Sequence, residues 1–140
     1  IPSIAMSQYF GPANAQIDDP FEAALTHGAD TVRRILDATP DDTGDYQLFY
    51  NVNFPPVPAA QVKGTRLSKQ GRRPGVRFST EPHQAPSGRR FVWIKGGNQQ
   101  VRTAPGTDAA DNLDGYITVT PMRADLTAHD MMDRLKALNT

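Results

Sequence analysis

The chain opens on an apolar run. Residues 1–7 combine β-branched isoleucines with small residues, a pattern typical of a central parallel strand that is buried on both faces. A parallel strand needs a neighbour and a crossover connection, and no residue before Ile1 supplies them. We therefore expect this strand to complete a sheet whose other strands lie upstream of Ile1.

A helix is predicted for residues 19–38. Asp19 suits the N-cap, Pro20 the first helical position and Glu22 the capping-box position. The helix should end near Ala38, before Pro40. Apolar residues recur at helical spacing along this stretch and form one stripe: Phe21, Ala24, Leu25, Gly28, Val32, Ile35 and Leu36.

Alternating and aromatic stretches predict further strands, and a last helix is predicted at residues 127–138. The expected strands are residues 46–52, 63–69, 76–80, 89–94 and 116–120, of which the second to fourth should form an antiparallel meander or extended hairpin. The fold class is therefore α/β. We divide the chain into an α/β core (1–60), a β-hairpin arm (61–105), and a core strand with the C-terminal helix (106–140).

Composition narrows the class of protein. With 38% hydrophobic and 21% charged residues the chain is globular, and its 140 residues fit one domain or a large part of one. No apolar run reaches the roughly 20 residues that a membrane helix needs, so we expect no membrane partner. Without cysteine, any metal would need His, Asp or Glu. This composition is compatible with a cytoplasmic location, which we expect.

The net charge of zero hides an asymmetry. Residues 61–102 carry ten Lys and Arg against a single acid, Glu81, while the rest of the chain has five bases and fourteen acids. A basic arm on an acidic body favours self-association or an anionic partner. Arginines interleaved with Phe78, Phe91 and Trp93 also suit a nucleic-acid platform, so assembly and nucleic-acid binding both stay open.

Candidate polar residues are few. Asn51 and Asn53 project to one face at a strand's end, where they either line a ligand crevice or bond the backbone of their own loop. Asp108, Asp111 and Asp114 lack the spacing of a calcium loop and are expected in a solvated turn. The three histidines form no metal-ligand pair. No catalytic set and no metal site is therefore predicted within the chain.

Six motifs nevertheless resemble one family, the SurE (stationary-phase survival) nucleotidases. They are "IPSIAMS" (1–7), "NVNFPPVP" (51–58), "KGTRLSKQGRR" (63–73), "RRFVWIKG" (89–96), "GTDAADNLDGYITVTPM" (106–122) and "DLTAH" (125–129). The resemblance runs the whole length and matches the C-terminal part of that family. It implies an incomplete doubly wound parallel sheet, an extended β-hairpin arm and a C-terminal helix.

The resemblance also implies an activity. SurE proteins are 5'/3'-nucleotidases that hydrolyse nucleoside monophosphates with a divalent metal, Mg²⁺ or Mn²⁺, whose ligands would lie mainly upstream of Ile1. The fragment alone should then be inactive and supply scaffold and oligomerisation elements. By the same resemblance Thr107 and Asp108 lie near the active site, so the candidate substrate-binding residues are Asn51, Asn53, Thr107 and Asp108.

Assembly is implied as well. In this family the hairpin joins dimers into tetramers, which places Phe91 and Trp93 at an interface, and the C-terminal helix is exchanged between subunits. Asp125 and His129, four residues apart and so on one helical face, would form the hinge of that exchange. The alternative is a non-enzymatic oligomerisation or nucleic-acid-binding module built on the basic hairpin.

Overall fold

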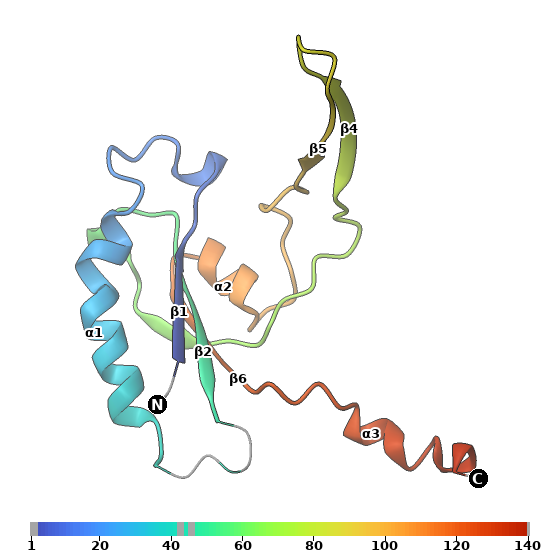
Figure 1. Ribbon diagram of the computed structural model, residues 1–140. Coiled ribbons are helices and arrows are strands. Elements are labelled where there is room, and N and C mark those ends of the chain that lie inside the picture. The colour runs from blue at the N-terminus through green and yellow to red at the C-terminus, as the bar shows by residue number, and fades with distance from the viewer. Residues whose placement is uncertain (1–2, 42–43, 45–46, 140) are drawn as a thin grey trace.

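Four strands form the central sheet, in the order β1–β2–β6–β3, in a computed structural model that describes residues 3–41, 44 and 47–139 (Figure 1). β1 (Ser3–Gln8) runs parallel to β2 (Phe49–Phe54), and β6 (Ile117–Met122) runs antiparallel to β2. The short strand β3 (Thr65–Leu67) lies parallel to β6 at one edge. The α/β class is confirmed, with a sheet of mixed direction.

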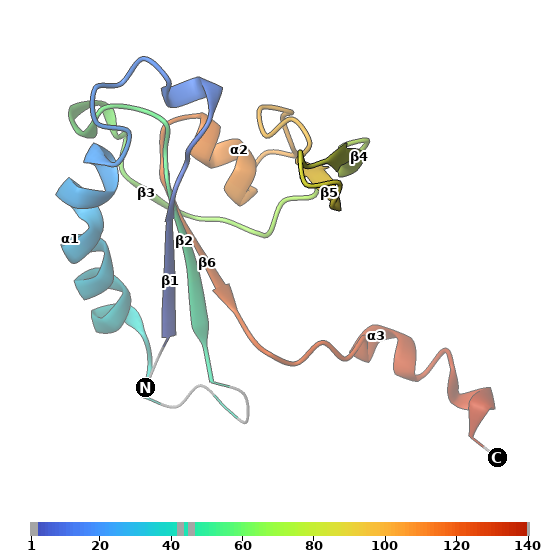
Figure 2. The same ribbon diagram turned by 45° about the horizontal axis from the view of Figure 1, so that its top comes forward.

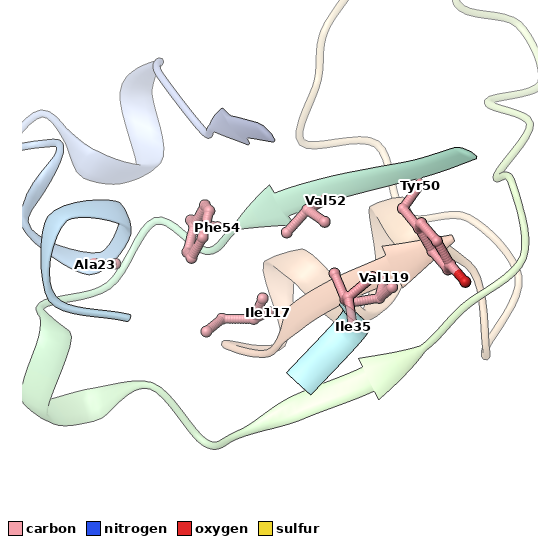
Figure 3. Packing of buried hydrophobic residues seen from close by; sticks show 7 residues of the cluster. All are labelled: Ala23, Ile35, Tyr50, Val52, Phe54, Ile117 and Val119. Carbon is pink, nitrogen blue, oxygen red and sulfur yellow. The ribbon is translucent and has the colours of Figure 1, made fainter. Parts of the chain in front are cut away.

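One face of the sheet is apolar and packs against helix α1 (Glu22–Ala38). Exposure alternates along β2, so that Val52 and Phe54 are 0% and 1% exposed while their neighbours are half-buried. This alternation follows from the two-residue period of a strand. Figure 3 shows the resulting core, whose members are Ala23, Ile35, Tyr50, Val52, Phe54, Ile117 and Val119.

The opposite face of the sheet is polar. Asn51 pairs with Thr120, and Asn53 pairs with Thr118, so the four side chains share the face that helix α2 (Asp108–Leu113) covers. Both threonines are buried. The chain thus segregates apolar residues to the α1 side and hydrogen-bonding residues to the α2 side.

Strand β1 differs from its prediction. Only Ile4 and Gln8 are partly buried, and the other four residues are exposed. Within the described residues β1 is an edge strand of its sheet, so no second neighbour covers it. The expectation of a strand buried on both faces is therefore wrong for this chain as it stands.

The observed boundaries of α1 and β2 differ slightly from the predicted ones. Helix α1 begins at Glu22 because Asp19 Oδ1 accepts a hydrogen bond from the Phe21 amide (2.9 Å), which forms a turn just before the helix. Its end at Ala38 is as predicted, and Thr39 Oγ1 donates to the Ile35 carbonyl (2.6 Å) there. The strand predicted at 46–52 begins at Phe49, and Tyr46 lies outside the described residues. Two short 3-10 turns, Pro12–Asn14 and Ala59–Gln61, follow β1 and β2.

A separate two-stranded hairpin projects from the body. It pairs β4 (Ser79–Gln84) with β5 (Arg90–Lys95) in antiparallel register and extends away from the central sheet in Figure 1, while Figure 2 shows it nearly end-on. The strand predicted at 63–69 joins β6 as β3 and takes no part in this hairpin. The predicted meander is therefore a hairpin of two strands.

The C-terminal segment also extends from the body. The single helix predicted at 127–138 is replaced by a short helix, α3 (His129–Met132), and a 3-10 turn, Lys136–Leu138. Neither contains a buried residue, and both lie far from the sheet in Figure 2. Short helices are marginal without tertiary packing, which accounts for the break.

Candidate substrate crevice

A crevice of about 440 Å³ opens at the carboxyl ends of β1 and β2, where ligands bind in open α/β sheets. Its floor comes from the end of β1 and from Asn53 of β2. One wall comes from α2 and the other from the segments that lead into and out of the hairpin. The lining residues are Ser7, Gln8, Tyr9, Phe10, Asn53, Gln70, Gly71, Arg73, Gln99, Asp108, Ala109 and Asn112.

Asp108 joins two parts of the crevice wall by hydrogen bonds. Its Oδ1 accepts hydrogen bonds from the amides of Gly71 (2.8 Å) and Ala109 (2.6 Å), and its own amide donates to the Lys69 carbonyl (2.8 Å). A Cβ at Gly71 would lie 2.9 Å from Asp108 Oδ1, so glycine is required by this close approach. The carboxylate therefore orders the loop after β3 against the first turn of α2.

The four candidate substrate residues divide into two pairs. Asn53 and Asp108 line the crevice, whereas Asn51 and Thr107 do not. Thr107 Oγ1 donates to the Ala104 carbonyl (2.6 Å) and contacts Thr103 Oγ1 (2.5 Å), so it stabilises the loop before α2. Asn51 lies one pleat further back on the same face as Asn53.

The prediction of a solvated turn at Asp108, Asp111 and Asp114 is wrong, above all for Asp111. Asp108 and Asp111 lie on helix α2, which Asp114 directly follows, and the side chain of Asp111 is 6% exposed. Arg66 Nη1 (3.0 Å) and Ser68 Oγ (2.7 Å) both donate to its carboxylate, while the Arg66 guanidinium lies 3.6 Å above the Tyr116 ring centre. The sequence spacing of three matched a helical repeat, a signal that the turn interpretation overlooked.

Two crevice residues carry buried polar atoms without partners. Tyr9 Oη and Arg73 Nε are buried and have no hydrogen-bond partner among the described residues. The Tyr9 ring passes close to Gly11, where an added Cβ would lie 3.1 Å from Oη. Sequence reasoning missed both residues, because Arg73 was counted with the basic arm and Tyr9 follows an ordinary strand.

The described residues do not fit a metal site of their own. No group of three or more His, Asp or Glu side chains among them could hold an ion. In the crevice Asp108 is the one carboxylate of the described lining, and two backbone amides already occupy its Oδ1. Elsewhere His27 Nε2 contacts the Ala59 carbonyl at 3.0 Å. A divalent ion in the crevice would therefore need ligands from other residues.

The predicted interface residues lie outside the crevice. Phe91 and Trp93 share one face of the hairpin and are 44% and 57% exposed. The His83 ring on the neighbouring strand contacts both, with its ring centre 5.7 Å from that of Phe91 and 5.9 Å from that of Trp93. These rings form an exposed aromatic surface on the arm.

In the C-terminal segment, His129 Nε2 lies 2.5 Å from Asp125 Oδ2. The hydrogen bond with His129, followed by those with the Thr127 side chain and amide, holds the pKa of Asp125 well below its usual range. The two residues of the predicted hinge are thus in direct contact, and the carboxylate form of Asp125 is favoured.

The fold is that of an α/β protein with a polar crevice at the carboxyl edge of its sheet, and comparison with known proteins identifies its family. The model of the survival protein SurE family matches residues 1–76. The 5'-nucleotidase SurE of Roseobacter denitrificans is 66% identical over 140 residues, covering 100% of this chain and 54% of that relative. The 5'-nucleotidase SurE of Ruegeria pomeroyi is 66% identical over 135 residues, or 96% of this chain and 52% of that protein. The chain belongs to the SurE family.

A solved structure agrees with this assignment. The SurE protein from Aquifex aeolicus superimposes with a TM-score of 0.69 at 30% identity, covering 100% of this chain and 52% of that one. This chain therefore spans about half the length of the relatives it matches. In its described part, no helix has the length and hydropathy needed to cross a bilayer.

Proposed function

We propose that this chain is part of a SurE-type 5'-nucleotidase that hydrolyses nucleoside monophosphates, and that it forms one wall of the substrate-binding crevice. The observation that carries the proposal is the crevice at the carboxyl ends of β1 and β2, in a chain whose 66% identical relatives are named 5'-nucleotidase. Asn53 and Asp108 would contact or position the substrate there. Asn51 and Thr107 would support them from the adjoining strand and loop.

The test compares two proteins. Phosphate release from a nucleoside monophosphate is measured with Mn²⁺ for the full-length protein that contains this chain, and for residues 1–140 alone. We expect turnover by the full-length protein and none by the 140 residues, because the described residues bring together no complete catalytic set. Comparable turnover by the shorter protein would contradict the division of roles.

Dependence on Mg²⁺ or Mn²⁺ belongs to the proposal. Among the described crevice residues only Asp108 has the carboxylate chemistry that such ions prefer, so most of the ligands would come from elsewhere in the protein. Activity should be lost on chelation and restored by added Mg²⁺ or Mn²⁺. A cytoplasmic location is likewise proposed.

We also propose that the hairpin and the C-terminal segment make homo-oligomer contacts, in a dimer or tetramer. Phe91 and Trp93 present apolar rings to solvent, and α3 has no buried residue. Exposed apolar surface of this kind marks interaction sites. The alternative is that the arm binds nucleic acid, which its basic residues favour. Binding through phosphates should weaken steeply with added salt, whereas an aromatic subunit contact should not.

A further inference from the structure

The segment between β1 and α1 supplies two residues of the crevice lining, Tyr9 and Phe10. It comprises residues 9–21, all of which the structure describes. Asn14 is its one buried residue, at 3% exposed, whereas every apolar side chain of the segment is exposed or half-buried. A segment without a buried apolar side chain gains little from hydrophobic packing. Its conformation therefore depends mainly on hydrogen bonds.

The side chain of Asn14 makes hydrogen bonds along the whole segment. Its Oδ1 accepts from the Gly11 amide (3.0 Å), and its Nδ2 donates to the carbonyls of Tyr9 (2.6 Å) and Pro20 (3.4 Å). Tyr9 and Pro20 lie near the two ends of the segment, so one side chain joins both ends. The Tyr9 amide in turn donates to the Phe54 carbonyl (3.0 Å) at the end of β2. The backbone of Tyr9 is thus held on both sides.

Asparagine suits this position because its amide carries both a donor and an acceptor. An aspartate would keep the acceptor for the Gly11 amide, but it would place a carboxylate oxygen against the two carbonyls that now receive hydrogen bonds. An alanine would leave all three backbone groups without this partner. Asn14 itself lies outside the crevice lining, so its influence on the crevice passes through the segment.

The exposed ring of Phe10 depends on the same arrangement. Phe10 is 69% exposed, and its stacking partner is the Phe21 ring, with centres 6.1 Å apart. Phe21 directly follows Pro20, whose carbonyl Asn14 binds. A ligand meets the wall already formed when the segment is ordered, and otherwise has to order the segment itself. Ordering on binding lowers affinity, because the loss of conformational entropy opposes it.

We propose that Asn14 is a positioning residue of the substrate crevice. It fixes the segment 9–21 so that Tyr9 and Phe10 form one wall of the crevice before the substrate binds, and it touches no substrate atom. The inference rests on the proposed nucleotidase function and adds to it a residue that sets substrate affinity from behind the wall. Because Asn14 has no part in the chemical step, its loss should raise KM and leave kcat nearly unchanged.

Steady-state kinetics of the full-length protein tests this role, with adenosine monophosphate as substrate and Mn²⁺ present. Asn14→Ala removes three hydrogen bonds, each worth a factor of roughly two to ten in an equilibrium, and water replaces part of what is lost. KM should therefore rise about 5- to 50-fold, with kcat within about twofold of wild type. Asn14→Asp has nearly the same shape but loses both donated hydrogen bonds, so its KM should rise as well.

Thr39→Ala is the matched control. Thr39 Oγ1 donates to the Ile35 carbonyl (2.6 Å) and contacts Tyr50 Oη (2.7 Å) at the opposite end of α1. The variant therefore also removes hydrogen bonds of a partly buried side chain, but Thr39 is remote in sequence from the segment and lies outside the crevice lining. Its KM should stay within about twofold of wild type, even where its melting temperature falls as far as that of Asn14→Ala.

Three results would overturn the positioning role. The first is a wild-type KM in folded Asn14→Ala or, where that variant does not fold, in Asn14→Asp. The second is a rise of KM in Thr39→Ala as large as that in Asn14→Ala, which would indicate a general loss of stability. The third is a loss confined to kcat.

Binding without turnover separates this inference from the proposed function. Adenosine, the product of the proposed reaction, is titrated calorimetrically into the full-length wild type and into Asn14→Ala. Weaker binding in Asn14→Ala, together with no phosphate release by the wild type, would overturn the nucleotidase proposal and retain the positioning role. Phosphate release by the wild type, with equal adenosine affinity and equal KM in both proteins, would overturn the positioning role and leave the nucleotidase function standing.

Discussion

The sheet and the hairpin use similar residues with opposite outcomes. In β2 alternate aromatic and β-branched side chains are almost fully buried, as Val52 and Phe54 illustrate, whereas every residue of β5 is exposed although it includes Phe91 and Trp93. The two strands differ in their neighbours, because β2 lies between β1 and β6 and packs under α1, whereas among the described residues β5 pairs with β4 alone. An isolated hairpin is at best marginally stable in water. Hydrophobic pattern therefore predicts a strand but not what covers it.

The crevice lies where these two regions meet. Its floor belongs to the sheet, and Arg73 and Gln99 come from the two segments that connect the hairpin to the body. Asp108 ties the first of these segments down through the Gly71 amide. The base of the arm therefore forms part of the crevice wall.

The largest effect is expected on the free energy of unfolding, when a phenylalanine of the core and one of the arm are each replaced by alanine. Phe54 is 1% exposed in the core and Phe78 is 80% exposed on the arm. Phe54→Ala should lower the free energy of unfolding by roughly 3–5 kcal/mol because it leaves a cavity, and Phe78→Ala should change it by less than about 0.5 kcal/mol. Urea unfolding of the full-length protein measures both. Equal losses would mean that the arm is as well packed as the core.

The second prediction concerns two aspartates of the segment 106–115. Asp111→Ala leaves the buried Ser68 hydroxyl and the half-exposed Arg66 without their acceptor, which should cost about 2–4 kcal/mol. Asp114 pairs with exposed Arg102 (2.9 Å), so Asp114→Ala should cost about 0–1 kcal/mol. Thermal unfolding checks both variants. A cost for Asp114→Ala that matches the cost for Asp111→Ala would contradict the assigned roles.

Much of this organisation follows from the sequence, and the misses have physical causes. The length of α1, the end of β2 at a proline-rich turn and the hairpin all depend on local pattern, and they appear within a few residues of prediction. The predicted stripe of α1 is right at Gly28 and Ile35 but wrong at Phe21, Leu25 and Leu36, which are exposed, because the helix turns Ala23 and Thr31 toward the sheet instead. Helix α2 was missed because aspartates commonly mark turns, while here Arg66 and Ser68, some 45 and 43 residues away, stabilise the acid. Non-local partners of this kind leave no local signal.

The crevice was predictable only in part. The position of Asn53 at a strand end and the family resemblance of the Asp108 loop pointed to the edge of the sheet where the crevice lies. Tyr9 and Arg73 could not be found that way, because their place in the crevice depends on how β1 and the root of the hairpin come together in space. Burial without a partner is a property of the fold, and one sequence does not reveal it.

The third prediction tests the arm as an interface. Trp93→Ala should remove a buried anchor between subunits, at a cost on the order of 2 kcal/mol or more in assembly. A tetramer should then separate into dimers, while the melting temperature of the body is nearly unchanged. Light scattering measures the size, and Val92→Ala on the other face of the same strand is the control. An intact tetramer together with weaker binding to single-stranded nucleic acid would favour the alternative function.

The smallest effect is expected at the start of the C-terminal segment, where the pKa of Asp125 is held below its usual range, first by the hydrogen bond with His129 and then by those with Thr127. A carboxyl group whose pKa is lower when folded stabilises the structure above its ordinary pKa of about 4. That stabilisation is lost as the pH falls through the lower folded value. The local turn should therefore persist from neutral pH to about pH 4 and open only below it.

The Thr127 amide reports this change, because it donates to Asp125 Oδ1 at 2.9 Å. Its NMR shift should hold steady from pH 7 to about pH 4 and then move toward the random-coil value in more acidic solution. In Asp125→Asn the acid-induced movement should be absent, and in Asp130→Asn it should be retained, because Asp130 takes no part in that contact. A Thr127 shift that moves at the same pH in Asp125→Asn would show that another group controls the turn. The Asp125 carboxylate would then not determine the geometry of the predicted hinge.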